Sequence, residues 1–155
     1  MRLRFEEMAH AAARKIAEAL RESNTSRLFG FDLQAAEPGR AVVRMRVRKR
    51  HRQIHGIVHG GILAALADTT GALGCYLSLP RGTHLATVEM KINYLEPVVE
   101  GVLYAEGKML RLGRNFAVAE CEVRDGAHRL VAKSLLTFAI VASPAKRDKK
   151  KKARK

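Results

Sequence analysis

Cysteine, tryptophan and long apolar stretches are scarce in this chain of 155 residues. It contains two cysteines and no tryptophan, and aromatic residues make up only 5% of it. Cys75 and Cys121 match no zinc or redox spacing, so we expect two reduced thiols, which fits a cytoplasmic location. No run of about 18 apolar residues is present to cross a bilayer, and the N-terminus lacks the apolar segment of a signal peptide. We therefore expect a soluble, cytoplasmic protein with no membrane insertion.

The common nucleotide and hydrolase motifs are also missing. There is no P-loop, no Gly-x-Gly-x-x-Gly and no nucleophile elbow, which argues against the enzyme classes that these motifs mark. His51, His55 and His59 repeat every four residues, and on a helix they would present three imidazoles to a zinc ion. Gly56 and the β-branched residues around it disfavour a helix there. We therefore expect no metal site.

Acidic residues are few compared with basic ones. The chain holds 29 Lys and Arg against 15 Asp and Glu, a net charge of +14. Residues 146–155 contain eight basic residues and one acid, which is half of that excess, and such a run is typical of a disordered tail. Weak attraction to nucleic acid or an anionic membrane is the functional alternative, although base-stacking aromatics are few. The basic body of the chain would also attract a polyanionic ligand.

The first half of the chain predicts a helix and two strands. Apolar residues in 1–22 recur at spacings of three and four, which indicates an amphipathic helix, followed by a linker up to residue 26. Arg27 to Ala36 reads as a first strand. After a turn, Arg40 to Arg48 alternates basic and apolar residues in its second half, which predicts a half-buried strand with a basic outer face.

The segment from Ile57 to Leu79 is nearly all apolar or small, and Asp68 is its only charge. Its all-round apolarity predicts a helix that is enclosed on every side, and its small residues would let a sheet approach closely. We expect the helix to begin at His59-Gly60-Gly61. The alternative is a start at Thr69 with Asp68 as the N-cap, but Ala64 to Ala67 favour helix over strand.

Four further segments predict strands, because each is rich in β-branched and aromatic residues and bounded by turn residues. They are Thr83–Leu95, Gly101–Leu112, Arg114–Arg124 and Arg129–Val141. The order of elements favours a single antiparallel sheet wrapped around one buried helix, with an extra N-terminal helix, in the α+β class. We expect one domain over 27–143 and a disordered basic tail over 144–155.

Asp68 and the two glycines before it are the candidate chemical groups. A lone carboxylate inside an apolar helix costs several kcal/mol unless it is paired or protonated, so Asp68 indicates a functional site. Gly60 and Gly61 fall in the first helical turn, where backbone N–H groups lack helical partners and can polarise a carbonyl. A plain glycine-rich loop remains the structural alternative.

The spacing of these groups along one helix has a consequence for assembly. Gly60 and Asp68 are eight residues apart, which is about 12 Å of rise and roughly 80° of rotation. They cannot both touch one carbonyl group. If both are catalytic, Gly60 of one chain must meet Asp68 of another, which requires a twofold dimer.

Several motifs together resemble the PaaI-like hotdog thioesterases, which include the phenylacetate-pathway and 4-hydroxybenzoyl-CoA types. The motifs are His59-Gly60-Gly61, Ala67-Asp68, the stretch Thr87 to Pro97, Gly113-Arg114 and Ala119 to Val123. The resemblance covers about residues 28 to 141. It implies a hotdog fold, a homodimer or a homotetramer built as a dimer of dimers, and coenzyme A bound where subunits meet.

The resemblance also implies a role for each matching position. Asp68 would act as nucleophile or general base, the Gly60 N–H would polarise the thioester carbonyl, and Thr87 would hold the water or the carboxylate. Gln53 falls where an asparagine is usual and keeps its amide. The substrate-binding positions implied are His59, Gly61, Arg114 and Asn115, with Arg114 a phosphate contact.

We therefore expect hydrolysis of an acyl-CoA or aryl-CoA thioester to coenzyme A and a carboxylic acid. No metal or redox cofactor is expected, and coenzyme A enters only as part of the substrate. The first alternative keeps the fold without turnover, as an acyl-CoA sensor or carrier. The second, a nucleic-acid-associated protein, ranks last, and we expect no specific nucleic-acid partner. The acyl group, the choice between nucleophile and base, and the choice between dimer and tetramer stay open.

Overall fold

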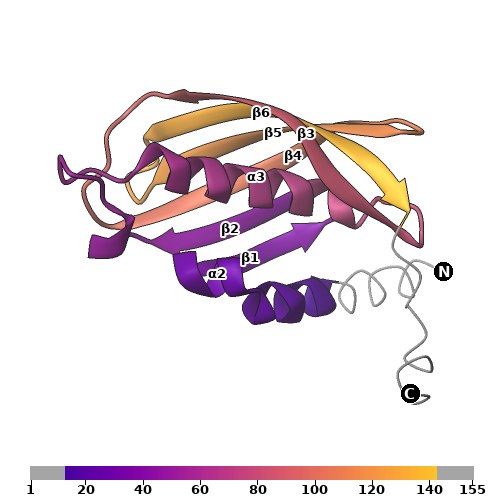
Figure 1. The fold of residues 1–155 in the computed structure, drawn as a ribbon, viewed down its shortest axis with the longest axis horizontal. Helices are drawn as coiled ribbons and strands as arrows, with labels where there is room; N and C mark the ends of the chain where they lie inside the picture. The colour runs from indigo at the N-terminus through magenta and orange to yellow at the C-terminus, as the bar shows by residue number, and fades with distance from the viewer. Residues whose placement is uncertain (1–12, 143–155) are drawn as a thin grey trace, which may run out of the picture.

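A long helix lies across the concave face of one curved antiparallel sheet in the computed structural model, which describes residues 13–142 (Figure 1). The sheet order is β1-β2-β4-β5-β6-β3, so β1 and β3 are its edges. The strands are β1 (Phe31–Glu37), β2 (Arg40–Arg46), β3 (Thr83–Tyr94), β4 (Val102–Leu112), β5 (Phe116–Asp125) and β6 (Leu130–Ala142). The last four predicted strands are confirmed to within two residues at each end.

The N-terminal region differs from the prediction in one element. Residues 13–22 are helical, as expected, but a second short helix, α2 (Asn24–Phe29), follows directly. Ser23 caps α2 by accepting a hydrogen bond from the Ser26 N–H, and Gly30 ends it in a left-handed conformation. The predicted strand start at Arg27 was therefore wrong, because the cap and the glycine delimit a helical turn.

The central helix α3 (Gly60–Tyr76) has His59 as its N-cap, so the expected start is confirmed and Asp68 lies within the helix. Two glycines let it approach the sheet. A Cβ atom on Gly74 would lie 2.8 Å from the carbonyl oxygen of Gly107 on β4, and one on Gly107 would collide with the backbone of Thr70. The small residues therefore do bring helix and sheet together.

The prediction that α3 is enclosed on every side was wrong for the single chain. Leu63, Leu66 and Cys75 are buried against the sheet, whereas Asp68 and Ala72 on the opposite side are only half-buried. One sheet can cover only one face of a helix. Within residues 13–142, the other face of α3 is therefore only partly covered.

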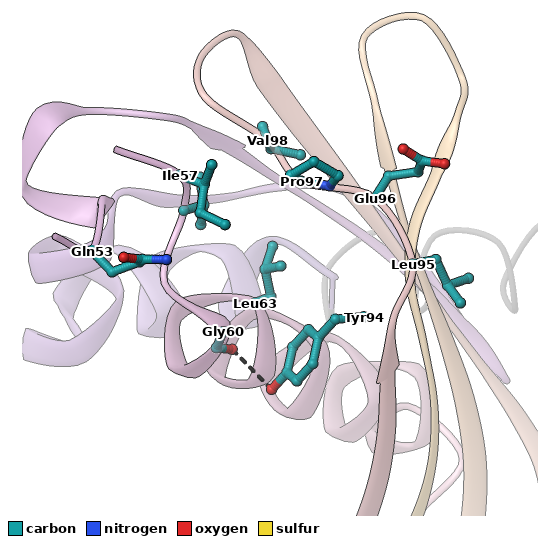
Figure 2. Close-up of a pocket in the computed structure, with 10 residues that line it drawn as sticks. Gln53, Ile57, Gly60, Leu63, Tyr94, Leu95, Glu96, Pro97 and Val98 are labelled. Carbon is teal, nitrogen blue, oxygen red and sulfur yellow. Dashed lines mark hydrogen bonds between the residues drawn. The ribbon is translucent and has the colours of Figure 1, made fainter. Parts of the chain in front are cut away.

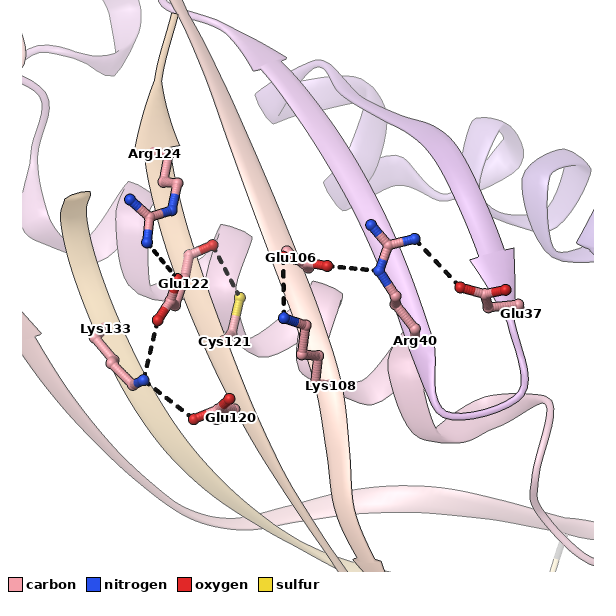
Figure 3. Close-up of polar contacts among 9 residues, drawn as sticks. All are labelled: Glu37, Arg40, Glu106, Lys108, Glu120, Cys121, Glu122, Arg124 and Lys133. Atoms are coloured by element: carbon pink, nitrogen blue, oxygen red, sulfur yellow. Dashed lines mark hydrogen bonds and ion pairs between the residues drawn. The ribbon is translucent and has the colours of Figure 1, made fainter. Parts of the chain in front are cut away.

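The outer face of the sheet is a network of ion pairs (Figure 3). On β2 the arginines alternate with the buried Ala41, Val43 and Met45, which confirms the half-buried strand with a basic outer face. Hydrogen bonding from Arg40 lowers the pKa of the Glu106 carboxyl. Further ion pairs are Arg44 with Asp32, Arg124 with Glu122, and Lys133 with both Glu120 and Glu122.

Both cysteines are buried and free of a disulfide. Burial raises the pKa of the Cys75 thiol to about 11 and that of Cys121 to about 12. No helix within residues 13–142 is both long and apolar enough to cross a membrane. The predicted basic tail over 144–155 lies outside the described residues.

Candidate active site

The first turn of α3 leaves one backbone amide free. The His59 imidazole accepts a hydrogen bond from the Gly61 N–H through Nδ1, at 2.8 Å, and the His59 carbonyl accepts one from Ile62. Among residues 13–142, the Gly60 N–H donates no hydrogen bond. The helix dipole adds positive potential at this amide. Gly60 therefore offers the free donor, whereas the Gly61 amide is already used by His59.

A cavity of about 320 Å³ opens beside this amide (Figure 2). It lies between the segment 53–58, the first turns of α3 and the chain that follows β3. Most of the lining is apolar, and the polar groups are few, as is typical of a small-molecule site. The lining residues are Gln53, Ile57, Val58, Gly60, Leu63, Tyr94, Leu95, Glu96, Pro97 and Val98.

Gln53 is held in place by its own loop. Its side-chain Oε1 accepts a hydrogen bond from the His55 N–H at 2.6 Å, and its backbone N–H donates to the Ile57 carbonyl at 2.8 Å. With the oxygen occupied, the amide nitrogen is the end of the side chain that remains for a ligand. The structure thus brings Gln53 and Gly60 to the same cavity.

Asp68 and Thr87 form a second group. The Thr87 hydroxyl donates a hydrogen bond to Asp68 Oδ1 at 2.9 Å, which ties α3 to the edge strand β3. A β-bulge at Val88, between Thr87 and Glu89, resets the alternation of β3 so that Thr87 and Met90 both face the helix. The bulge therefore explains why Thr87 reaches Asp68.

The two groups do not meet in one chain. The cavity beside Gly60 includes neither Asp68 nor Thr87, which is the separation expected from the helix geometry. Arg114 and Asn115 are exposed in the turn between β4 and β5. Figure 1 shows this turn at the same end of the sheet as the C-terminal end of α3. In a single chain these two residues are therefore far from the Gly60 end of the helix.

Tyr94 is a site residue that the sequence reasoning missed. It is the last residue of β3, it lines the cavity, and its hydroxyl donates a hydrogen bond to the Gly60 carbonyl at 3.1 Å. The only signal was its position just before Leu95-Glu96-Pro97. Its contact with Gly60 depends on how β3 crosses α3, which a local sequence pattern does not reveal.

A short basic segment precedes the cavity. The 3-10 helix η1 (Lys49–His51) lies directly after Arg48, two residues before Gln53. Within the part of the chain that the structure describes, Arg48, Lys49 and Arg50 have no ion-pair partner. Burial lowers the pKa of the His51 imidazole, and the charges of Arg50 and Arg48 lower it further. Arg48, Lys49 and Arg50 are exposed and together form the η1 cationic segment.

A metal centre is not apparent in the described region. Over residues 13–142, no group of three or more His, Cys, Asp or Glu side chains is placed to hold an ion. The three histidines at four-residue spacing do not share a helix. His51 is in η1 and buried, His55 is exposed in the following loop, and His59 caps α3.

Comparison with known proteins places this chain and its fold in a family. Residues 55–132 match the sequence model of the thioesterase superfamily. The 1,4-dihydroxy-2-naphthoyl-CoA hydrolase of Escherichia coli strain K12 is 31% identical over 132 residues, which cover 83% of this chain and 97% of that protein. A thioesterase of Haemophilus influenzae superposes with a TM-score of 0.79 at 27% identity, over 87% of this chain and 94% of that one.

The resemblance inferred from the motifs is also supported by structure. The Escherichia coli PaaI protein, from the phenylacetic acid degradation operon, has the same fold, with a TM-score of 0.79 at 24% identity over 87% of this chain and 96% of that one. The described residues therefore have the hotdog fold of these thioesterases. The chain belongs to the thioesterase superfamily, and it is a thioester hydrolase.

Proposed function

We propose that this chain hydrolyses acyl-CoA or aryl-CoA thioesters, releasing coenzyme A and a carboxylic acid. The observation that carries the proposal is that α3 holds two separate groups, each of which would supply half of an active site. Gly60 has a free N–H and lines an apolar cavity, and Asp68 is held by the Thr87 hydroxyl at the edge of the sheet. Together they supply the polarising donor and the carboxylate that thioester hydrolysis requires.

In this proposal the thioester carbonyl oxygen lies against the Gly60 N–H, with the Gln53 amide as a second donor. Both donors stabilise the negative charge that grows on that oxygen. Asp68 either bonds to the carbonyl carbon, forming a mixed anhydride that water then hydrolyses, or takes a proton from a water whose oxygen attacks that carbon. The C–S bond breaks in either route, and coenzyme A leaves as a thiolate that takes up a proton.

Completion of the site needs a second copy of the chain. β3 is an edge strand with an exposed outer side, and Val88 at its bulge is 58% exposed. An uncovered edge of this length is a ready surface for strand pairing. We propose that β3 pairs with β3 of a twofold-related copy, which would bring the partner's Gly60 end toward Asp68. The cytoplasmic location remains a prediction, and the choice between dimer and tetramer stays open.

The nucleotide end of coenzyme A carries several negative charges. Two basic surfaces are available to it: the η1 cationic segment next to the cavity, and Arg114 in the β4–β5 turn. We propose that the phosphates lie against the η1 cationic segment or, across the subunit interface, against Arg114 and Asn115. Guanidinium groups pair with phosphate oxygens in a bidentate manner, which favours arginine in both places.

The decisive experiment measures thiol release from a panel of aromatic and aliphatic CoA esters by the wild type and by Asp68→Asn. We expect turnover by the wild type and a loss of at least about a hundredfold in the variant, because a positioned acid or base is removed. The melting temperature should stay close to that of the wild type. Tight binding of an acyl-CoA without turnover would instead support the sensor or carrier alternative.

A further inference from the structure

Tyr94 contacts the catalytic turn in a way that the proposed reaction does not yet use. Its hydroxyl donates to the Gly60 carbonyl at 3.1 Å, although the two residues are 34 positions apart in the chain. The Gly60 carbonyl and the Gly61 N–H belong to the same peptide group. Since His59 Nδ1 accepts from that N–H at 2.8 Å, side chains hold this peptide at both ends. The orientation of the first helical turn is therefore set from β3 as well as from the cap.

The ring of Tyr94 also determines which residue fits at position 60. A Cβ atom on Gly60 would lie 3.2 Å from Tyr94 Cζ and 3.4 Å from Cε1, and the three nearest atoms all belong to this tyrosine. The backbone of Gly60 itself is helical, a conformation open to any residue. A larger residue at position 60 would therefore require the Tyr94 ring to move by a few tenths of an ångström.

We propose that Tyr94 is a positioning residue for the oxyanion-binding amide. Its hydroxyl fixes the Gly60–Gly61 peptide, and its ring keeps the Gly60 Cα against the cavity wall, so that the Gly60 N–H points at the thioester carbonyl. This inference rests on the proposed thioesterase function. The inference adds Tyr94 to the proposed site, a residue that motif spacing in the sequence does not identify.

The hydroxyl is tested by Tyr94→Phe, with Tyr104→Phe as the matched control. Tyr104 is 41% exposed on β4, between the buried Leu103 and Ala105. One neutral hydrogen bond is worth about 1 kcal/mol, so we expect Tyr94→Phe to lower kcat about fivefold while KM changes less than about twofold. Tyr104→Phe should behave as wild type. Wild-type kcat in Tyr94→Phe would overturn the proposal.

The ring is tested by a double-mutant cycle with Gly60→Ala, which keeps the N–H. In the wild-type background the added methyl group displaces the ring, and we expect kcat to fall about tenfold. In the Tyr94→Ala background the same change should cost less than about threefold, because neighbouring residues are energetically coupled. An equal loss in both backgrounds would overturn the proposal.

A readout that does not need turnover separates this inference from the proposed function. Tyr94→Phe should shift the backbone amide resonances of Gly60 and Gly61 and speed hydrogen exchange at Gly61, and Tyr104→Phe should do neither. Unchanged resonances would contradict the positioning role. If the wild type cleaves no thioester while these resonances shift, the proposed function fails and the Tyr94 contact stands.

Discussion

At the scale of single residues, the candidate site depends on which polar atoms already have partners. The Gly61 N–H, the Gln53 Oε1 and one oxygen of Asp68 are each bound within the chain. What remains for a substrate is the Gly60 N–H, the Gln53 amide nitrogen and the second oxygen of Asp68. A site prepared in this way has few polar groups to reorganise as charge develops.

His51 gives a pH-dependent prediction at this scale. Its side chain is 1% exposed, and Nδ1 accepts from the Arg48 N–H at 3.1 Å. Burial lowers its pKa in the folded state, so as pH falls the unfolded chain binds the proton first. Stability from neutral His51 is therefore present above the ordinary histidine pKa of about 6.5 and is lost as pH falls toward the lower folded value.

We expect the free energy of unfolding to fall more steeply for the wild type than for His51→Gln between about pH 7 and about pH 5. Urea denaturation at several pH values measures it. His55→Gln is the control, since His55 is exposed, and it should follow the wild type. Identical pH slopes for His51→Gln and wild type would contradict the prediction.

Asp68, Gly60 and Thr87 were available from the sequence because they stand in short motifs, and Gln53 because of its position in the family resemblance. The structure pairs Asp68 with Thr87 and places Gln53 with Gly60, and their catalytic roles remain predictions. Tyr94 was not found, because its partner is 34 residues away and the contact depends on where β3 crosses α3. The half-exposed state of Asp68 was also unforeseen, since one chain covers only one side of the helix.

At the scale of elements, the packing of α3 on β4 depends on two glycines. Gly107 faces the backbone of Thr70, and Gly74 faces the carbonyl of Gly107, so the helix and strand touch through main chain. Main chain cannot move aside as a flexible side chain can. This contact fixes how deeply α3 lies in the sheet, and hence where its first turn and Asp68 are placed.

Gly107→Ala should therefore destabilise the fold by about 3 kcal/mol, at the upper end of the usual cost of overpacking. Chemical denaturation measures this change. Gly126→Ala is the matched control, because its Cβ would meet only the Val102 carbonyl, at an ordinary 4.0 Å. A Gly107→Ala variant as stable as the control would show that α3 can move away from β4 at little cost.

The η1 cationic segment supports a prediction about substrate recognition. Replacing Arg48, Lys49 and Arg50 by glutamine should raise KM for an acyl-CoA about fivefold to tenfold, because attraction between exposed charges is worth about 1 kcal/mol per close pair. The KM for the matching S-acyl pantetheine, which lacks the phosphates, should not change. Both are measured by thiol release.

The control for this prediction neutralises Lys15, Arg21 and Arg27 in the N-terminal helices, which changes net charge by the same amount. That variant should keep the KM of the wild type for both substrates. If Arg114→Gln alone raises KM for acyl-CoA and the η1 variant does not, the phosphates lie at the β4–β5 turn instead.

Sequence composition predicted the long elements. α3 was found because residues 57–79 are nearly all apolar or small and favour a helix, and the last four strands because each is rich in β-branched and aromatic residues between turn residues. α2 was missed because six residues are too few to show a helical period, and its cap and its terminal glycine lie within a stretch typical of loops.

At the scale of the whole molecule, β3 is the surface on which the proposed assembly depends. Val88→Lys places a charge at the bulge of this exposed edge, and edge lysines oppose strand pairing. We expect sedimentation analysis to show the wild type as a dimer or a dimer of dimers and the variant as a smaller species. Thiol release should fall in parallel.

Leu28→Lys is the control for that experiment, since Leu28 is 59% exposed on α2 and is not part of β3. It should leave both sedimentation and activity unchanged. A wild type that sediments as a monomer and still cleaves thioesters would contradict the shared site.

Two inactive variants should restore activity when mixed. Gly60→Pro removes the amide proton at a position where proline fits the first helical turn, and Asp68→Asn removes the carboxylate. A mixed dimer has one site with both defects and one site with none. After the two chains are refolded together in equal amounts, we expect about a quarter of the wild-type turnover, as random pairing requires. Turnover no higher than that of either variant alone would contradict a site shared between chains.

Because α3 separates Gly60 from Asp68, the catalytic rate should depend on the fraction of chains that have associated. A single chain would have both the Gly60 amide and the Asp68 carboxylate, but the two could not act on the same thioester. Rate per chain should then fall as the protein is diluted below its dimer dissociation constant, and a substrate that bridges two copies should restore it by holding them together. The concentration of the thioester would then shift the equilibrium between single chains and assembled protein.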